Sequence, residues 1–258
     1  MFFVLPFLVS CGISTAEKTP ISNPTIPVKS ECGRGGNLSK LTFPESTESL
    51  KGLILTYLNN GGDPLTLPEA FDNLAPNSSQ SIALKIIYVD ISGDNVDEII
   101  ALAEVRNKAI VHKTVVWVFS CFSGAYTQAG YVDGAASSFD PKIIAVEDLN
   151  GDNVPEVVIQ LSWRVGCLEK FFVIGWNQSK AIDYLASDGV LNFLSPAWFE
   201  CETLLTFQDQ DNDNQKELIF TGETPVGNDN QLRKFIYTYE VANMQNYVRV
   251  SEQYQELR

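Results

Sequence analysis

Oxygen-bearing side chains recur at alternate positions in three acidic segments, DISGDNVDEII, DLNGDNVPEVV and DQDNDNQKELI, which begin at residues 90, 148 and 209. Each segment has side-chain oxygens at positions 1, 3, 5 and 9, and the backbone carbonyl of position 7 can supply another ligand. In a tight loop these oxygens converge on one point, and a hard cation prefers oxygen ligands, so the sequence predicts Ca²⁺ sites. The predicted ligands are Asp90, Ser92, Asp94, Val96, Glu98, Asp148, Asn150, Asp152, Val154, Glu156, Asp209, Asp211, Asp213, Gln215 and Glu217.

Position 6 of every loop is an asparagine, namely Asn95, Asn153 and Asn214. A chain that curls around an ion needs a left-handed backbone there, which Gly, Asn and Asp tolerate best. The alternative for any single loop is an acidic β-turn, because the same residues dominate turns. Three loops in register, with the same acid at position 9, favour Ca²⁺. An EF-hand is excluded because position 12 is not a glutamate, and Mg²⁺ demands a stricter octahedral geometry.

The loops belong to a repeat of about sixty residues that covers roughly residues 81–258. In each unit the loop follows a short apolar run and precedes a strand-like segment, and two further strand-like segments come after it. Each unit is therefore predicted to be a four-stranded antiparallel meander, which is the blade of a β-propeller. The expected fold class is mainly β, with about three blades preceded by a short helical segment.

The pattern D-x-[SND]-[GN]-D-N-x-x-E followed by an apolar strand resembles the FG-GAP/VCBS repeats, a family that includes the integrin α-subunit propeller and many bacterial surface proteins. The resemblance implies calcium ligands at positions 1, 3, 5, 7 and 9. The chain departs from the family pattern with Asn at position 6 and with Asn212 at position 4 of the third loop. It also has fewer repeats than a closed family propeller, so we expect an open or incomplete one.

Residues 41–80 precede the repeats and contain an amphipathic helical pattern. Apolar side chains recur at helical spacing, Ser46 or Thr47 can cap the N-terminus, and Gly61 follows the C-terminus. A stripe of this width favours a helix docked on a sheet over a helix that binds a partner. The residues of the stripe are Leu50, Leu53, Ile54, Tyr57 and Leu58.

The first residues, MFFVLPFLVSC, form an apolar run that is too short to span a bilayer and has the length of a signal-peptide core. Leu8-Val9-Ser10-Cys11 resembles a bacterial lipobox, which implies lipidation of Cys11 and residues 1–10 as the signal peptide. The run lacks a preceding basic residue, and a conventional secretory signal is the alternative. Residues 11–40 have the composition of a flexible tether. We therefore expect an exported, lipid-anchored protein.

Four further cysteines, Cys32, Cys121, Cys167 and Cys201, are consistent with disulfides in an exported chain. The blade register predicts a disulfide between Cys167 and Cys201, because adjacent blades bring both to the rim opposite the acidic loops. Cys121 is expected on the loop side, where only Cys32 could reach it, and the pairing of these two stays open. Buried free thiols are the alternative.

The formal charge of −14 and the pI near 4.4 argue against a nucleic-acid partner, which needs a field of Lys and Arg. We expect a non-enzymatic calcium-binding surface module for adhesion, ligand binding or scaffolding. The alternative is a carbohydrate-active enzyme or a glycan-binding module that uses exposed aromatic side chains, for which Trp163 and Trp198 are candidates. Packing is the default interpretation for Trp117 and Trp176. His112 is expected in a solvated connection, outside any catalytic motif.

Overall fold

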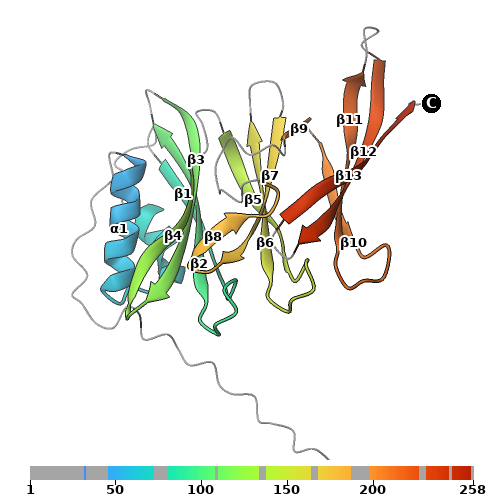
Figure 1. Cartoon of the computed structure of the whole chain (residues 1–258). Helices are drawn as coiled ribbons and strands as arrows, with labels where there is room; N and C mark the ends of the chain where they lie inside the picture. Colours follow the sequence, from blue (N-terminus) through green and yellow to red (C-terminus); the bar gives the residue numbers. More distant parts are fainter. Residues whose placement is uncertain are drawn as a thin grey trace, which may run out of the picture.

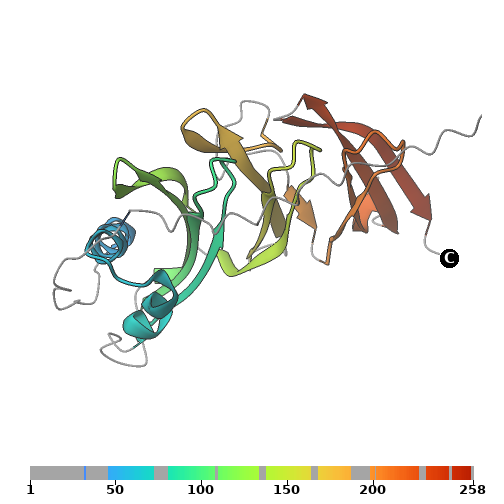
Figure 2. The same cartoon turned by 90° about the horizontal axis from the view of Figure 1, so that it is seen from below.

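The computed structural model describes residues 32, 46–72, 81–107, 110–133, 138–163, 168–186, 198–200, 202–226, 231–243 and 246–256. Its strands form three separate antiparallel sheets that lie side by side in a row, with the helices at one end (Figures 1 and 2). None of the described sheets closes on itself. The mainly β fold class predicted from the sequence is confirmed, together with its division into three meanders.

Each sheet is built from strands that pair with their neighbours in sequence order. The first contains β1 (Ser81–Val89), β2 (Glu98–Asn107), β3 (Ile110–Phe122) and β4 (Ala125–Asp133). The second contains β5 (Ser138–Glu147), β6 (Glu156–Trp163), β7 (Leu168–Asn177) and β8 (Lys180–Asp183), and the short β9 (Trp198–Glu200) also pairs with β7. The third contains β10 (Leu204–Gln208), β11 (Glu217–Val226), β12 (Gln231–Asn243) and β13 (Asn246–Glu256).

The helical segment comprises α1 (Thr47–Asn59), a short 3₁₀ turn η1 (Pro64–Thr66) and α2 (Leu67–Asp72). Ser46 caps α1 through a capping box with Ser49, whose backbone N–H donates to the Ser46 hydroxyl at 3.1 Å. Gly61 follows the helix with φ of 81°, a left-handed conformation typical of a helix end. The apolar stripe of α1 packs against one face of the first sheet, as the sequence predicts.

The sheets pack face to face, so the central strands of the first and second sheets are buried on both sides. In β2, Ile99 and Ala101 face the helices, whereas Ile100 and Leu102 face the second sheet. A strand buried on both faces needs a continuous apolar run rather than an alternating pattern, which explains the run IIALA at 99–103. The second sheet likewise contributes to the core shared with the first sheet and to the core shared with the third.

One disulfide joins Cys32 to Cys121 near the end of β3, with the Cα atoms 5.8 Å apart. It links residue 32 to the first sheet and settles a pairing that the sequence leaves open. Of residues 1–45, only Cys32 lies within the described residues, so Cys11 lies outside them. Cys167 and Cys201 also lie outside them, and their disulfide stays a prediction. None of the helices that the structure describes is long and apolar enough to cross a membrane.

Candidate metal loops

The three acidic loops occupy equivalent places, because each connects the first two strands of its sheet. The first loop joins β1 to β2, the second joins β5 to β6, and the third joins β10 to β11. All three lie along the same edge of the structure, at the bottom in Figure 1. The repeat in the sequence therefore corresponds to a repeat in space.

The aspartate at position 1 closes each loop by accepting two backbone hydrogen bonds that recur in all three loops, and Asp90 also accepts the N–H of Asp94 at 3.2 Å. The N–H of position 4 donates to its Oδ1 atom and the N–H of position 6 to its Oδ2 atom. The two distances are 2.7 and 2.8 Å at Asp90, 2.8 and 2.9 Å at Asp148, and 2.7 and 3.1 Å at Asp209. The same atoms thus shape the backbone in all three loops.

Position 6 has the left-handed backbone that the sequence predicts, with φ of 66° at Asn95, 68° at Asn153 and 71° at Asn214. Position 4 is left-handed as well, with φ of 74° at Gly93, 80° at Gly151 and 66° at Asn212. The sequence interpretation missed this second position. The recurrence of Gly, Gly and Asn there is a signal that could have found it, since these residues tolerate positive φ best.

The aspartate at position 5 accepts a hydrogen bond from the backbone two residues further along the chain. In every loop the backbone N–H of position 7 donates at 2.8 Å to the Oδ1 atom of the position 5 aspartate, which is Asp94, Asp152 or Asp213. These aspartates therefore act as local backbone acceptors as well as candidate ligands. The residues at position 7 are Val96, Val154 and Gln215.

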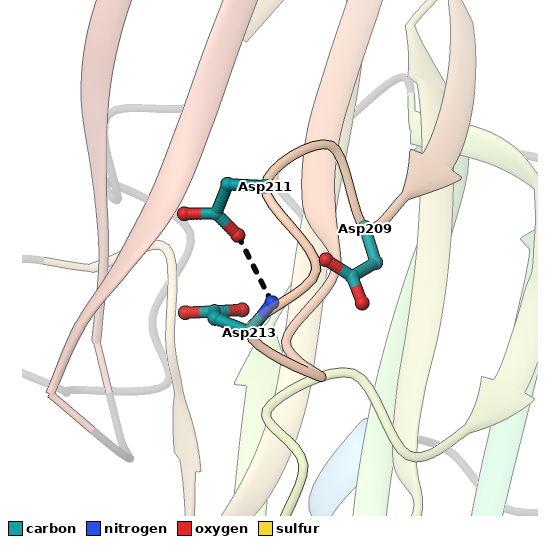
Figure 3. A group of neighbouring side chains, drawn as sticks. All are labelled: Asp209, Asp211 and Asp213. Carbon is teal, nitrogen blue, oxygen red and sulfur yellow. Dashed lines mark hydrogen bonds between the residues drawn. The ribbon is translucent and has the colours of Figure 1, made fainter.

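The third loop brings three carboxylates together. One oxygen from each of Asp209, Asp211 and Asp213 lies within 4.8 Å of the others, and all three residues are exposed (Figure 3). The backbone N–H of Asp213 donates to Oδ1 of Asp211 at 3.2 Å, which holds positions 3 and 5 side by side. Among the described residues, this is the one such group of three acidic, histidine or cysteine side chains.

The first two loops carry a neutral residue at position 3. The Ser92 hydroxyl donates to Oδ1 of Asp90 at 3.3 Å, and the amide oxygen of Asn150 accepts the N–H of Asp152 at 3.0 Å. These loops offer oxygens at the predicted positions with one carboxylate fewer than the third. The third loop therefore has the most carboxylates at the predicted ligand positions.

The glutamate at position 9 has a different environment from the other candidates. Glu98, Glu156 and Glu217 are the first residues of β2, β6 and β11, and they are only 1%, 1% and 6% exposed. Each accepts the backbone N–H of position 2 of its own loop, at 3.1, 2.8 and 2.6 Å respectively. Glu217 is not part of the carboxylate group at Asp209, Asp211 and Asp213. Position 9 thus holds the loop to its strand in this structure.

Burial raises the pKa of all three glutamates, so they bind a proton more readily than exposed glutamates do. It raises the pKa of Glu98 to about 7, where the hydrogen bond from Ser120 opposes the shift and the charges of Asp94 and Asp90 add to it. Burial raises the pKa of Glu156 to about 8, and the pKa of Glu217 is also raised by burial. A cation held by the aspartates would favour the charged carboxylates and oppose these shifts.

Neighbouring loops contact one another through position 4. A Cβ atom added to Gly93 would lie 2.9 Å from a methyl carbon of Val154 in the second loop. One added to Gly151 would lie 2.7 Å from the carbonyl oxygen of Asn214 in the third. The backbone N–H of Lys216 also donates to the carbonyl of Leu149 at 2.7 Å. Glycine at position 4 of the first and second loops therefore allows each of these two to pack against the next loop.

A cleft of about 710 Å³ opens beside the first two loops, between the first and second sheets. Asp94 and Asp152 line it, and so do Cys121 and Trp176. Cys121 thus lies on the loop side, as expected. Trp176 is half-buried against the core shared by these two sheets. The prediction that it packs in the core is therefore confirmed only for part of its side chain.

Trp117, Trp163, Trp198 and His112 lie on strands, outside the acidic loops. Trp117 is fully buried, as predicted. Trp163, half-buried at the end of β6, does not line the cleft, and Trp198 belongs to β9. His112 lies within β3, so its predicted place in a connection was wrong. The reason is that β3 begins at Ile110, well before its continuous apolar run at 115–119.

No protein-family model matches the chain, and neither a curated protein nor a solved structure matches it.

Proposed function

We propose that the chain is a calcium-binding, non-enzymatic surface module built from three propeller-type blades of the FG-GAP/VCBS kind and anchored to a membrane through a lipid on Cys11. The observation that carries the calcium part of the proposal is the group formed by Asp209, Asp211 and Asp213 in the third loop. Its role would be to hold a ligand, or to act as a scaffold, outside the cell.

Electrostatics favours a cation at this group. Two unit charges about 4 to 5 Å apart in water repel by roughly 0.8 to 1 kcal/mol, and a bound divalent ion converts that repulsion into attraction. The donor set consists of carboxylate, amide and carbonyl oxygens, which suits Ca²⁺ better than a metal that prefers nitrogen or sulfur. Because the other two loops share the backbone of the third, the proposal extends to them with weaker affinity.

The propeller-type arrangement is supported by three meanders that pack face to face with equivalent loops along one edge. The non-enzymatic role is supported by the acids themselves. Asp94 and Asp152, which line the cleft, each accept a backbone N–H at 2.8 Å from a residue two positions further on. A carboxylate that shapes its own loop in this way is a poor candidate for transferring protons to a substrate.

Two measurements test the proposal: calorimetric titration of the protein with Ca²⁺, and thermal unfolding with and without Ca²⁺. Extracellular modules bind Ca²⁺ with a Kd of about 10⁻⁴ to 10⁻³ M. A free Ca²⁺ concentration of about ten times the Kd therefore adds about 1.4 kcal/mol per site to the free energy of unfolding. That corresponds to a rise in Tm of roughly 3 to 6 °C for each filled site. Equal concentrations of Mg²⁺ should produce a smaller rise, and EDTA should reverse the effect.

The sharpest variant is Asp213→Asn. Asparagine keeps the oxygen that accepts the N–H of Gln215 but removes one charge from the group, so the loop keeps its shape and loses affinity. Glu48→Gln in α1 is the matched control, because that side chain is exposed and lies outside the loops. A wild-type chain that shows neither heat of Ca²⁺ binding nor a response of Tm to EDTA would refute the proposal.

A further inference from the structure

The cleft between the first and second sheets has the size of a site for a small molecule, since such sites occupy roughly 300 to 1,000 Å³. We propose that it binds a neutral oligosaccharide, with one sugar ring stacked on the indole of Trp176. This inference names the ligand class of the module proposed above and therefore rests on that proposed function.

Trp176 has the features of a fixed aromatic platform. Its side chain packs at the margin of the core shared by the two sheets, and its Nε1 atom donates to the carbonyl of Gln178 at 3.2 Å. Both contacts hold the ring in one orientation while part of it stays accessible. The apolar face of a sugar ring matches the face of an indole, and a rigid aromatic side chain loses little entropy when it binds.

A second aromatic side chain lies across the cleft. Phe122, at the end of β3, is 72% exposed and lines the same space as Trp176. A large apolar ring held in water beside a cleft gains free energy when a ligand covers it. Two aromatic rings contributed by different sheets can therefore contact successive units of a chain-like ligand.

The polar lining fits hydroxyl groups. Hydroxyls and side-chain amides both donate and accept hydrogen bonds, as the hydroxyls of a sugar do. Such neutral groups dominate the polar part of the cleft. They belong to Ser92, Ser120, Thr127, Gln128, Gln178, Ser179 and Tyr184.

Charge excludes an anionic ligand and argues against a cationic one. Among the residues that the structure describes, no lysine or arginine lines the cleft, so a phosphate or a uronate would find no cationic partner there. The charged side chains of the lining are Asp94 and Asp152, which are also the position 5 residues of the first two loops. Once these loops hold Ca²⁺, the ion offsets most of the charge on the carboxylates and weakens their attraction for an amine. A neutral polyhydroxyl ligand is compatible with the loaded loops.

The test is calorimetric titration of the exported chain in about 1 mM CaCl₂ with malto-, cello-, xylo- and mannohexaose. Oligogalacturonate and chitosan hexamer serve as anionic and cationic comparisons. We expect at least one neutral hexamer to bind and Trp176→Ala to weaken that binding by about 10- to 100-fold. Trp163→Ala is the control, because Trp163 lies at the opposite end of β6 from the cleft and should leave affinity unchanged.

Ca²⁺ titration of the same samples separates the two proposals. Normal Ca²⁺ binding without any neutral hexamer bound overturns the inference and leaves the proposed function intact. Binding of a neutral hexamer without any Ca²⁺ binding overturns the calcium part of the proposed function and leaves the inference about the cleft intact. Preference for chitosan, or full affinity in Trp176→Ala, also overturns the inference. If Trp176→Ala does not fold, Gln128→Ala at an exposed position of β4 replaces it, and the same weakening is expected.

Discussion

Gly151 lies so close to Asn214 that a Cβ atom at position 151 would be 2.7 Å from the Asn214 carbonyl oxygen. Gly151 also has φ of 80°. The second and third loops therefore meet at a point where no side chain fits, and the contact couples two sheets through their acidic loops. In the third loop the same position is Asn212, which has no counterpart loop among the described residues to pack against.

We expect Gly151→Ala to lower the free energy of unfolding by about 2 to 4 kcal/mol, since it combines left-handed strain with a steric clash. Gly124→Ala is the control, because Gly124 has φ of 84° but nothing within 4 Å of the added atom. It should cost about 1 to 2 kcal/mol. Urea unfolding measures both, and equal losses would show that the contact between the loops does not matter.

The stability of the calcium-free protein should fall as pH rises from about 5 to 8. Burial raises the pKa of Glu156 from 4.5 to about 8, so the folded state binds more protons than the unfolded state in this window. The stabilisation is complete below the unfolded pKa and is lost as pH passes the folded one. Thermal unfolding in EDTA checks this. Glu156→Gln, which still accepts the N–H of Leu149, should reduce the slope, whereas Glu48→Gln should not.

Reduction of the Cys32–Cys121 disulfide should destabilise the protein. The bridge closes a loop with a sequence separation of 89 residues, for which the chain-entropy relation gives roughly 4 to 5 kcal/mol. Urea unfolding of Cys121→Ser against the oxidised wild type measures the loss. Peptide mapping without reductant should recover the 32–121 pair, and it also tests the predicted bridge between Cys167 and Cys201. A 121–167 or 121–201 pair would contradict the arrangement of the sheets.

The proposed lipid anchor predicts that Cys11→Ser releases the protein from membranes. Lipidation attaches the acyl chains through that thiol, and they supply the apolar surface that holds the mature chain in the bilayer. Detergent partitioning and incorporation of labelled palmitate measure it in a bacterial host. A wild-type product that is unlabelled and soluble would mean that the cysteine follows a conventional secretory signal.

Much of the fold follows from local patterns. The turn residues and apolar runs at about sixty-residue intervals predict three meanders, and the stripe through Leu50 and Ile54 predicts a docked helix. The strand β9 escaped prediction because three residues that pair with β7 carry too short a pattern. The start of β3 was missed for a related reason, since the strand extends beyond its buried apolar centre.

Some features of the candidate site could be predicted from the sequence, and others could not. The backbone of position 6 could be predicted because left-handed φ limits the residue type. The buried environment of Glu156 and its bond to Leu149 could not, because a glutamate spaced as a ligand looks the same in a sequence as one that supports the loop. The cleft beside Trp176 was also beyond prediction, since it depends on how two sheets separated in the chain pack together.

The hydrogen bonds at position 1 imply that the loops are preorganised. Asp90, Asp148 and Asp209 hold the backbone N–H groups of positions 4 and 6 through hydrogen bonds that their own carboxylates accept. Binding of a cation would therefore require little ordering of the chain, so the ordering cost would be small. The favourable free energy of binding would come mainly from reduced repulsion between the carboxylates. Hydrogen exchange at the amides of Gly93 and Asn95 should accordingly be slow both with Ca²⁺ and without it. These loops would act as rigid receptors for the ion, in contrast to binding loops that fold only when the ion arrives.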